Sequence, residues 1–176
     1  MEEYHNGICC KYYINKQNIL YRKSFIFNKK NEGKYILYWE NGQLWASYNL
    51  IDNKKEGIYK SYHKNGQLCE IHNYKNDKGE GNYKSYHDNG QLEITCNYKN
   101  DKKEGKYEVY HVNGQLYRIV NYKNGKKEGE YKEYYENGQL KIICNYKNNN
   151  LEGEYKQYHE NGQLLVRFNY KNNRRI

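Results

Sequence analysis

Histidines that recur at multiples of 24 residues are the first candidates for chemistry in this sequence. They are His63, His87, His111 and His159. Imidazole binds metals and transfers protons near neutral pH. However, Trp39 and Tyr135 occupy the same position in other segments, which favours a flat ring there rather than an imidazole. If the histidines lie about two inter-strand spacings apart, ~10 Å, neighbours cannot share an ion whose ligands lie ~2 Å away. We therefore expect a structural role for these rings, with no metal and no cofactor.

The cysteines show no metal-binding or disulfide pattern. There are five, an odd number, and none belongs to a CxxC motif, which favours a reducing compartment. Cys96 and Cys144 share one repeat position with Val120 between them, so they are too distant for a disulfide and are expected to be small buried residues. Cys9 and Cys10 are adjacent near the N-terminus. They are either reactive thiols or part of a strand.

Glutamates precede a recurring glycine and could suggest acid–base catalysis. They are Glu56, Glu80, Glu104, Glu128 and Glu152. Their identical repetition argues against catalysis, which needs one asymmetric constellation of nucleophile, base and orienting group. Local charge balance with the neighbouring lysines is the interpretation we favour. No P-loop, G-x-S-x-G or H-E-x-x-H motif occurs, so the sequence predicts a protein that is not an enzyme.

Lysines form two further rows and are the candidates for anion binding. The candidate anion-facing lysines are Lys60, Lys84, Lys132 and Lys156. A second row comprises Lys75, Lys99, Lys123, Lys147 and Lys171. Such rows could bind acidic phospholipid, or they could simply keep a sheet soluble. Acidic residues between the lysines favour the second interpretation, and nucleic acid is not favoured as a partner.

A 24-residue repeat must position all of these residues. Asn-Gly-Gln-Leu recurs with its glycine at Gly42, Gly66, Gly90, Gly114, Gly138 and Gly162. Glu-Gly recurs in the same phase. The sequence predicts six repeats at 33–56, 57–80, 81–104, 105–128, 129–152 and 153–176, preceded by a degenerate first repeat and N-terminal cap at 1–32.

Each repeat is predicted to be a β-hairpin. Asn-Gly between two β-prone runs favours a two-residue type I′ turn, which would pair His63 with Leu68 and Tyr59 with His72. The polar Asn-x-Lys-Lys-Glu-Gly segment is expected to be the loop to the next hairpin. Because 24 residues leave no room for a crossover helix, we predict an all-β fold: an open single-layer antiparallel meander of β-hairpins, an elongated solenoid-like sheet. Rows of tyrosine and leucine should form its thin interior, since the chain has 24 Tyr.

The last hairpin strand and the residue after each leucine are the predicted partner surface. Gln163 to Tyr170 is expected to be an unpaired edge strand, open to strand addition by another copy of the chain. Variable residues such as Trp45 and Tyr117 are where specificity could reside. The candidate partner surface is Trp45, Tyr117, Leu164, Leu165, Val166, Arg167, Phe168, Arg174 and Arg175.

The string Asn-Tyr-Lys-Asn-Gly-Lys-Lys-Glu-Gly-Glu-Tyr at 121–131, with Asn-Gly-Gln-Leu at 137–140, resembles a MORN repeat. The variant is similar to that of the YwqK-like antitoxin-annotated family. Tyr stands where the family usually has Trp after Glu-Gly. The resemblance implies a twisted single-layer sheet used for protein or membrane-lipid association, and its family label implies neutralisation of a partner enzyme as a further alternative.

Composition limits the class and the location of the protein. The net charge of +9 favours solubility, and the acidic start without an apolar run argues against a signal peptide. No stretch reaches membrane-spanning length. We expect an intracellular, cytoplasmic protein, in the host cytoplasm if viral, since the Asn, Lys, Tyr and Ile bias resembles that of A/T-rich genomes. The leading prediction is a non-enzymatic repeat scaffold that binds a protein partner, with a homodimer through the C-terminal edge strand. Peripheral binding to acidic phospholipid is the alternative.

Overall fold

A computed structural model describes residues 2–5, 8–14, 20–26 and 32–176. Two compact units, Met1–Gly90 and Gln91–Ile176, are distinguished by their internal contacts. The strands of the first unit are β1 (Glu2–His5), β2 (Ile8–Ile14), β3 (Leu20–Ile26), β4 (Gly33–Tyr38), β5 (Leu44–Ile51), β6 (Lys54–Tyr62), β7 (Leu68–Lys75) and β8 (Lys78–Tyr86). Those of the second are β9 (Leu92–Lys99), β10 (Lys102–Tyr110), β11 (Leu116–Lys123), β12 (Lys126–Tyr134), β13 (Leu140–Lys147), β14 (Asn150–Leu151), β15 (Gly153–Tyr158), β16 (Leu164–Lys171) and β17 (Arg174–Arg175).

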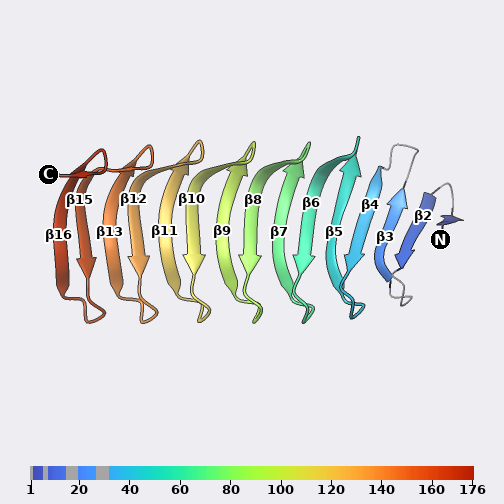
Figure 1. The fold of residues 1–176 in the computed structure, drawn as a ribbon, viewed down its shortest axis with the longest axis horizontal. Helices are drawn as coiled ribbons and strands as arrows, with labels where there is room; N and C mark the ends of the chain where they lie inside the picture. Colours follow the sequence, from blue (N-terminus) through green and yellow to red (C-terminus); the bar gives the residue numbers. More distant parts are fainter. Residues whose placement is uncertain (1, 6–7, 15–19, 27–31) are drawn as a thin grey trace. The chain divides into compact units, whose positions relative to one another are not determined.

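Within each unit the strands form a single-layer antiparallel meander. Strands that follow one another in sequence are paired, from β1–β2 to β7–β8 in the first unit and from β9–β10 to β16–β17 in the second. Figure 1 shows this order within each unit, for example β6 beside β7 in the first and β12 beside β13 in the second. The described ranges contain no helix. The predicted open all-β meander with a 24-residue repeat is therefore confirmed.

The Asn-Gly end of each hairpin, here called the tip, is longer than predicted. In the repeat that contains β6 and β7, the N–H of His63 donates to Gln67 O and the N–H of Gly66 donates to His63 O. Only Gly66 has a positive φ, +87°. This is a turn followed by a left-handed glycine, the three-residue loop that adds a bulge. Tyr62 therefore pairs with Leu68, and the predicted His63–Leu68 pair is wrong, whereas the pair of Tyr59 with His72 is confirmed.

The two-residue turns lie at the other end of the strands, where a longer loop was predicted. Asn76 and Asp77 both have positive φ, 52° and 66°, which defines a type I′ turn between β7 and β8. The same turn occurs at 52–53, 100–101, 124–125, 148–149 and 172–173. The Lys-Lys-Glu-Gly segment is thus part of a strand: Lys102 pairs with Lys99, and Glu104 pairs with Asn97. The strand continues because Gly105, with φ +74°, lies where the register shifts at a bulge.

One face of the sheet carries the buried residues and is here called the tyrosine face. In the second unit its centre is Val120, Tyr131 and Cys144, against which Tyr107 and Tyr146 pack. Tyr131 and Tyr146 make an edge-to-face contact with centroids 5.7 Å apart. In the first unit Tyr35 and Ala46 are buried on this face, and the buried polar residues there are Ser61, His72 and Ser85.

The predicted leucine row does not belong to this interior. Leu44, Leu68, Leu92, Leu116 and Leu140 are only partly buried, and Leu164 is exposed. The bulge explains the difference, because it pairs each leucine with the tyrosine before the tip instead of with the tip ring. Small and aromatic side chains at the centre of the strands form the interior instead.

Lysine side chains lie over part of the tyrosine face. Lys103 Nζ lies 4.0 Å from the ring centre of Tyr107 and 5.2 Å from that of Tyr122. Lys127 lies similarly over Tyr131 and Tyr146. Burial lowers the pKa of Lys103, and its contact with the aromatic faces is a favourable cation–π interaction. The aliphatic stems of these lysines shield the rings from water.

Candidate interaction surfaces

The tip rings have a structural role that explains why they are interchangeable. Four of them, Trp39, His63, His111 and Tyr135, reach the backbone carbonyl of the residue 23 positions later, in the next repeat. Trp39 Nε1 donates to Tyr62 O at 3.1 Å, and the Tyr135 hydroxyl donates to Tyr158 O at 2.8 Å. His63 Nε2 lies 2.8 Å from Tyr86 O. Trp, His and Tyr share a flat ring with a polar hydrogen at its far end, so this position selects for that combination.

The tip asparagine and glutamine also contact the next repeat. Asn65 Oδ1 accepts the N–H of Gln67, and Asn65 Nδ2 donates to Asp88 O at 2.6 Å. Asn113 and Asn137 make the corresponding bonds. Gln67 Oε1 lies 2.8 Å from the point where a Cβ on Gly90 would stand. The Asn-Gly-Gln motif therefore closes the tip and attaches it to its neighbour.

In three repeats the variable residue after the leucine lies on the ring of its own tip. The ring centres of Trp39 and Trp45 are 5.3 Å apart, and those of His111 and Tyr117 are 4.9 Å apart. Lys141 Nζ lies 5.5 Å from the centre of the Tyr135 ring. The residues at this repeat position, here called the variable row, are Trp45, Cys69, Glu93, Tyr117, Lys141 and Leu165. Trp45 is 41% exposed and Leu165 is 45% exposed.

The glutamate row binds the backbone of the type I′ turns. Glu104 Oε2 accepts the N–H of Asn124 at 2.7 Å, and Glu128 accepts that of Asn148 at 2.8 Å. Glu56 and Glu152 make the same bond. The second turn residue adds bonds to the preceding repeat, as where Asn149 Oδ1 accepts the N–H of Lys127 at 2.6 Å. The role of the row is thus more specific than the charge balance expected from sequence.

The buried cysteines match their predicted role. Cys96 and Cys144 are both buried and both free. Burial raises the pKa of each thiol to about 11, which disfavours the reactive thiolate. Cys69 is free and only partly buried. Cys9 and Cys10 lie in β2, so the prediction that they are part of a strand is confirmed, while the prediction of reactive thiols concerns side chains outside the described ones.

A buried carboxylate on the tyrosine face was not predicted. Glu133 Oε2 accepts the Tyr131 hydroxyl at 2.7 Å, and Glu133 Oε1 lies 2.9 Å from Lys141 Nζ. Arg118 Nη2 lies 3.8 Å away. Burial alone would raise the pKa of Glu133, but these hydrogen bonds and cations together lower it. Nothing in the periodic pattern marks this site, because the position of Glu133 is held in earlier repeats by Leu37, Ser61, Ser85 and Val109.

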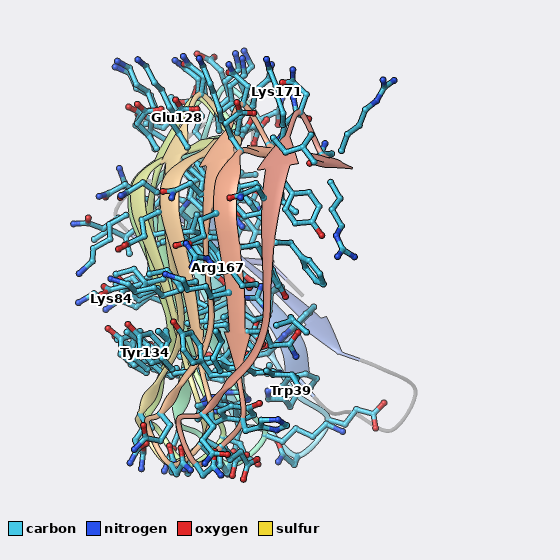
Figure 2. The ribbon with its side chains drawn as sticks, turned by 90° about the vertical axis from the view of Figure 1, so that its left-hand side faces the viewer. Trp39, Lys84, Glu128, Tyr134, Arg167 and Lys171 are labelled. Carbon is cyan, nitrogen blue, oxygen red and sulfur yellow. The ribbon has the colours of Figure 1, made fainter. Side chains whose placement is uncertain are left out.

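The candidate anion-facing lysines lie on the face opposite the tyrosine face. Figure 2 shows Lys84 and Trp39 of the first unit projecting from opposite sides of the sheet. In the second unit Lys132 Nζ lies 2.6 Å from Glu130 Oε1, and Lys156 Nζ contacts Glu154. Two of the four candidates are therefore already paired with carboxylates, and that pairing reduces their attraction for an external anion.

The C-terminal edge is partly covered by the chain itself. After the turn at 172–173, β17 pairs Arg175 with Tyr170 and Arg174 with Lys171. Ile176 N–H then donates to Asn169 O. The prediction that 163–170 is wholly unpaired is thus wrong for its final part, because the chain folds back after the turn and Arg175 pairs with Tyr170. The remainder, Leu164 to Phe168, pairs with β15 and with no second strand in the described ranges.

The other predicted edge residues have intramolecular contacts. Arg167 forms an ion pair with Glu154. The Arg175 guanidinium carbon lies 3.7 Å from the ring centre of Phe168. Leu164 and Leu165 remain exposed, at 51% and 45%. Leu164 and Leu165 are thus exposed apolar side chains at the tip end of this edge.

Two searches of the described residues bear on other kinds of site. In the ranges given above, no group of three or more His, Cys, Asp or Glu side chains is placed to hold a metal ion. Nor does any helix in that part of the chain have the length and apolar character to cross a membrane.

The fold and these contacts define a repeat protein in which each hairpin is attached to the next at the tips, at the turns and along the strands. The chain belongs to the MORN repeat variant family, whose model matches residues 31–52, 55–76, 79–100, 103–124, 127–148 and 151–172. MORN repeats are generally associated with protein or membrane binding, and their scaffold is typically non-enzymatic.

Comparisons with individual proteins add little. No curated protein matches the chain. Among solved structures, the crystal structure of TcdB2-TccC3-Cdc42 is similar at 12% identity and a TM-score of 0.21, over 94% of this chain and 14% of that chain. That likeness carries no argument about fold or function.

Proposed function

We propose that the protein is a non-enzymatic scaffold that binds a protein partner through the variable row. The observation that carries this proposal is the two-layer arrangement at the tips. In three repeats the tip ring is hydrogen-bonded to the next repeat and carries on its face a side chain that differs from one repeat to the next, Trp45, Tyr117 or Lys141. A rigid support beneath varied, partly exposed side chains suits recognition, because little conformational entropy is lost when a partner binds.

The Trp39–Trp45 pair is the strongest candidate anchor in the row. Tryptophan is enriched among residues whose truncation most weakens binding. The two tryptophans are the only ones in the chain, and they lie together at one tip. Trp39 is fixed by its bond to Tyr62 O, so Trp45 is presented in a defined position.

Affinity purification with the intact chain tests the proposal. Partners recovered by the unmodified protein are compared with those recovered by Trp45→Ala and by Ile58→Ala. Ile58 is a matched control, because it is also exposed, at 54%, but is not part of the variable row. We expect Trp45→Ala to lower recovery of a specific partner about tenfold, which corresponds to about 1.4 kcal/mol. Equal recovery by Trp45→Ala and the unmodified protein would contradict the proposal.

A further inference from the structure

The type I′ turns place like charges directly opposite one another. In the second unit Lys99 pairs with Lys102, and Lys123 pairs with Lys126, each across a two-residue turn. Lys171 pairs with Arg174 in the same way. Like charges at directly opposed positions destabilise an antiparallel pair. Three of the four turns in this unit are therefore flanked by a pair of cations that repel each other.

These cations also differ from the lysines at the middle of the strands that form ion pairs. Lys106, Lys132 and Lys156 each form an ion pair with a glutamate two residues away. All the turn-flanking cations are exposed, and none of the ion pairs found among the described residues includes one of them. They are Lys99, Lys102, Lys123, Lys126, Lys147, Lys171 and Arg174, here called the turn ridge. Figure 2 shows the side chains that project from this end of the sheet, with Lys171 and Glu128 labelled.

The glutamates nearest to the turn ridge are occupied by backbone groups. Glu104, Glu128 and Glu152 each accept a hydrogen bond from the first residue of a turn. Those carboxylates still contribute negative charge, but their positions are fixed by these bonds. The turns at 124–125 and 172–173 contain no acidic residue, so the repulsion between the opposed cations there is left for an external anion to relieve. An arrangement that destabilises the fold, and that no other contact within the protein offsets, is characteristic of a functional site.

We propose that the turn ridge binds an extended, acidic segment of a partner protein, with a carboxylate at about every third residue. This rests on the proposed function and names the chemistry of the partner. Successive turns in the unit are two inter-strand spacings apart, ~10 Å. A segment in the polyproline II conformation rises ~3.1 Å per residue with three residues per turn, so every third side chain points the same way, roughly 9 Å apart. A carboxylate on every third residue thus meets one cation pair after another.

Other anionic partners fit this ridge less well. Binding of single-stranded nucleic acid relies on aromatic side chains on which bases stack. Stable attachment to a membrane takes an apolar or lipid anchor in addition to basic residues. The four turns read Lys-Asn-Asp-Lys, Lys-Asn-Gly-Lys, Lys-Asn-Asn-Asn and Lys-Asn-Asn-Arg, without an aromatic or apolar residue. A peptide carboxylate needs only the charges that are present.

The test measures binding of a fluorescent peptide built of four Asp-Gly-Ser triplets to the intact protein by anisotropy. A second peptide of the same composition carries its four aspartates in one block. The variant Lys102→Glu/Lys126→Glu reverses one member of two opposed pairs. Lys60→Glu/Lys84→Glu makes the same change of net charge away from the ridge and is the matched control. Phosphatidylserine vesicles and an oligothymidine are tested in parallel.

We expect the spaced peptide to bind more tightly than the block peptide. The ridge variant should weaken this binding by a factor of about ten or more, while the control variant changes it less than about twofold. The ridge variant should also melt no lower than the unmodified protein, since it replaces a repulsive pair with an attractive one. That result excludes unfolding as the cause of lost binding.

Several outcomes would overturn the inference: equal weakening by both variants, equal binding of both peptides, or tighter binding of the vesicles or the oligonucleotide than of the spaced peptide. The proposed function can fail separately. If Trp45→Ala leaves partner recovery unchanged while the ridge variant loses the peptide, the variable row is excluded and the ridge is retained. The opposite pattern retains the variable row and excludes the ridge.

Discussion

At the scale of single residues, the repeat selects for shared chemistry rather than for one amino acid. The tip ring is Trp, His or Tyr because each can reach a carbonyl of the next repeat, as Trp39, His63 and Tyr135 do. A metal-binding or catalytic interpretation of the histidines required the imidazole itself. The substitutions in the same position already argued against that interpretation, and the observed hydrogen bonds supply the physical reason.

Tyr135→Phe is predicted to destabilise the protein by about 1 kcal/mol. The substitution keeps the ring but removes the hydroxyl that donates to Tyr158 O, so this partly buried carbonyl loses its side-chain donor. Chemical denaturation monitored by circular dichroism measures the change. Tyr134→Phe is the control, because Tyr134 lies next in sequence on the opposite face of the strand and has no such bond. A cost as large for Tyr134→Phe would show that the bond to Tyr158 is not responsible.

Glu133→Gln is predicted to lower stability at neutral pH by about 2 kcal/mol, since hydrogen bonds to a charged group are lost from a buried site. The pKa of Glu133 is lowered in the folded protein. Its stabilising contribution is therefore complete above the ordinary glutamate pKa and is lost as the pH falls through the lowered value. The difference in unfolding free energy between the two proteins should shrink in acid. A difference that stays constant from neutral to acidic pH would exclude this linkage.

At the scale of elements, the type I′ turns lie at the opposite end of the strands from the end where they were predicted, and the longer loops lie at the Asn-Gly tips. Asn-Gly was predicted to form the type I′ turn, yet Asn65 keeps a negative φ and only Gly66 is left-handed. The type I′ turns form at Asn-Asp, Asn-Asn and Asn-Gly between repeats. Hairpins, their length and their order could be predicted from the 24-residue period. The turn type could not, because it depends on hydrogen bonds to neighbouring repeats that no single hairpin contains.

Gly125→Asn is predicted to raise stability by about 0.5–1 kcal/mol. Gly125 occupies the second position of a type I′ turn, where Asn149 and Asn173 each accept a backbone N–H with the side chain. Asparagine tolerates the left-handed conformation, and a Cβ at Gly125 would meet only ordinary contacts with Lys102. Thermal and denaturant unfolding measure the gain.

Gly138→Asn is the comparison, because Gly138 is a tip glycine with φ +81°, and Gln115 Oε1 lies 3.3 Å from its ideal Cβ. This change should destabilise the protein. If both substitutions had the same sign, the two glycine positions would not differ as the structure indicates.

At the scale of the whole molecule, the repeat boundaries depend on which residue of the 24-residue period is counted as the first. The family model begins each repeat at 31, 55, 79, 103, 127 and 151, two residues before each predicted boundary. Both phases describe the same array, since the period is identical. Of the predicted partner surface, Trp45, Tyr117 and Leu165 belong to the variable row, and their role in binding stays a prediction. In the turn ridge, Lys99 and Lys123 were predicted to belong to a row of lysines. Lys102 and Lys126, which pair with them, were predicted to lie in a loop.

The C-terminal edge predicts self-association of the chain described here. Leu164 and Leu165 are exposed beside backbone groups of β16 that have no second strand in the described ranges. We expect a dimer at high concentration in analytical ultracentrifugation. Leu165→Lys should shift it to the monomer, because a charge at the edge opposes pairing of two copies. Ile58→Lys, a change at an exposed residue away from the edge, is the control. A monomer at every concentration would contradict the prediction.

The contacts between tips have a consequence for how such arrays change during evolution. Asn65 and Asn113 bind main-chain carbonyls of the following repeat, and the tip rings do the same. A carbonyl is offered by every amino acid, so these tip contacts do not depend on the side-chain identity of the neighbouring hairpin. Recombination that duplicates, deletes or reorders whole hairpins would preserve the tip contacts, and mutation could then alter the variable row without disturbing them.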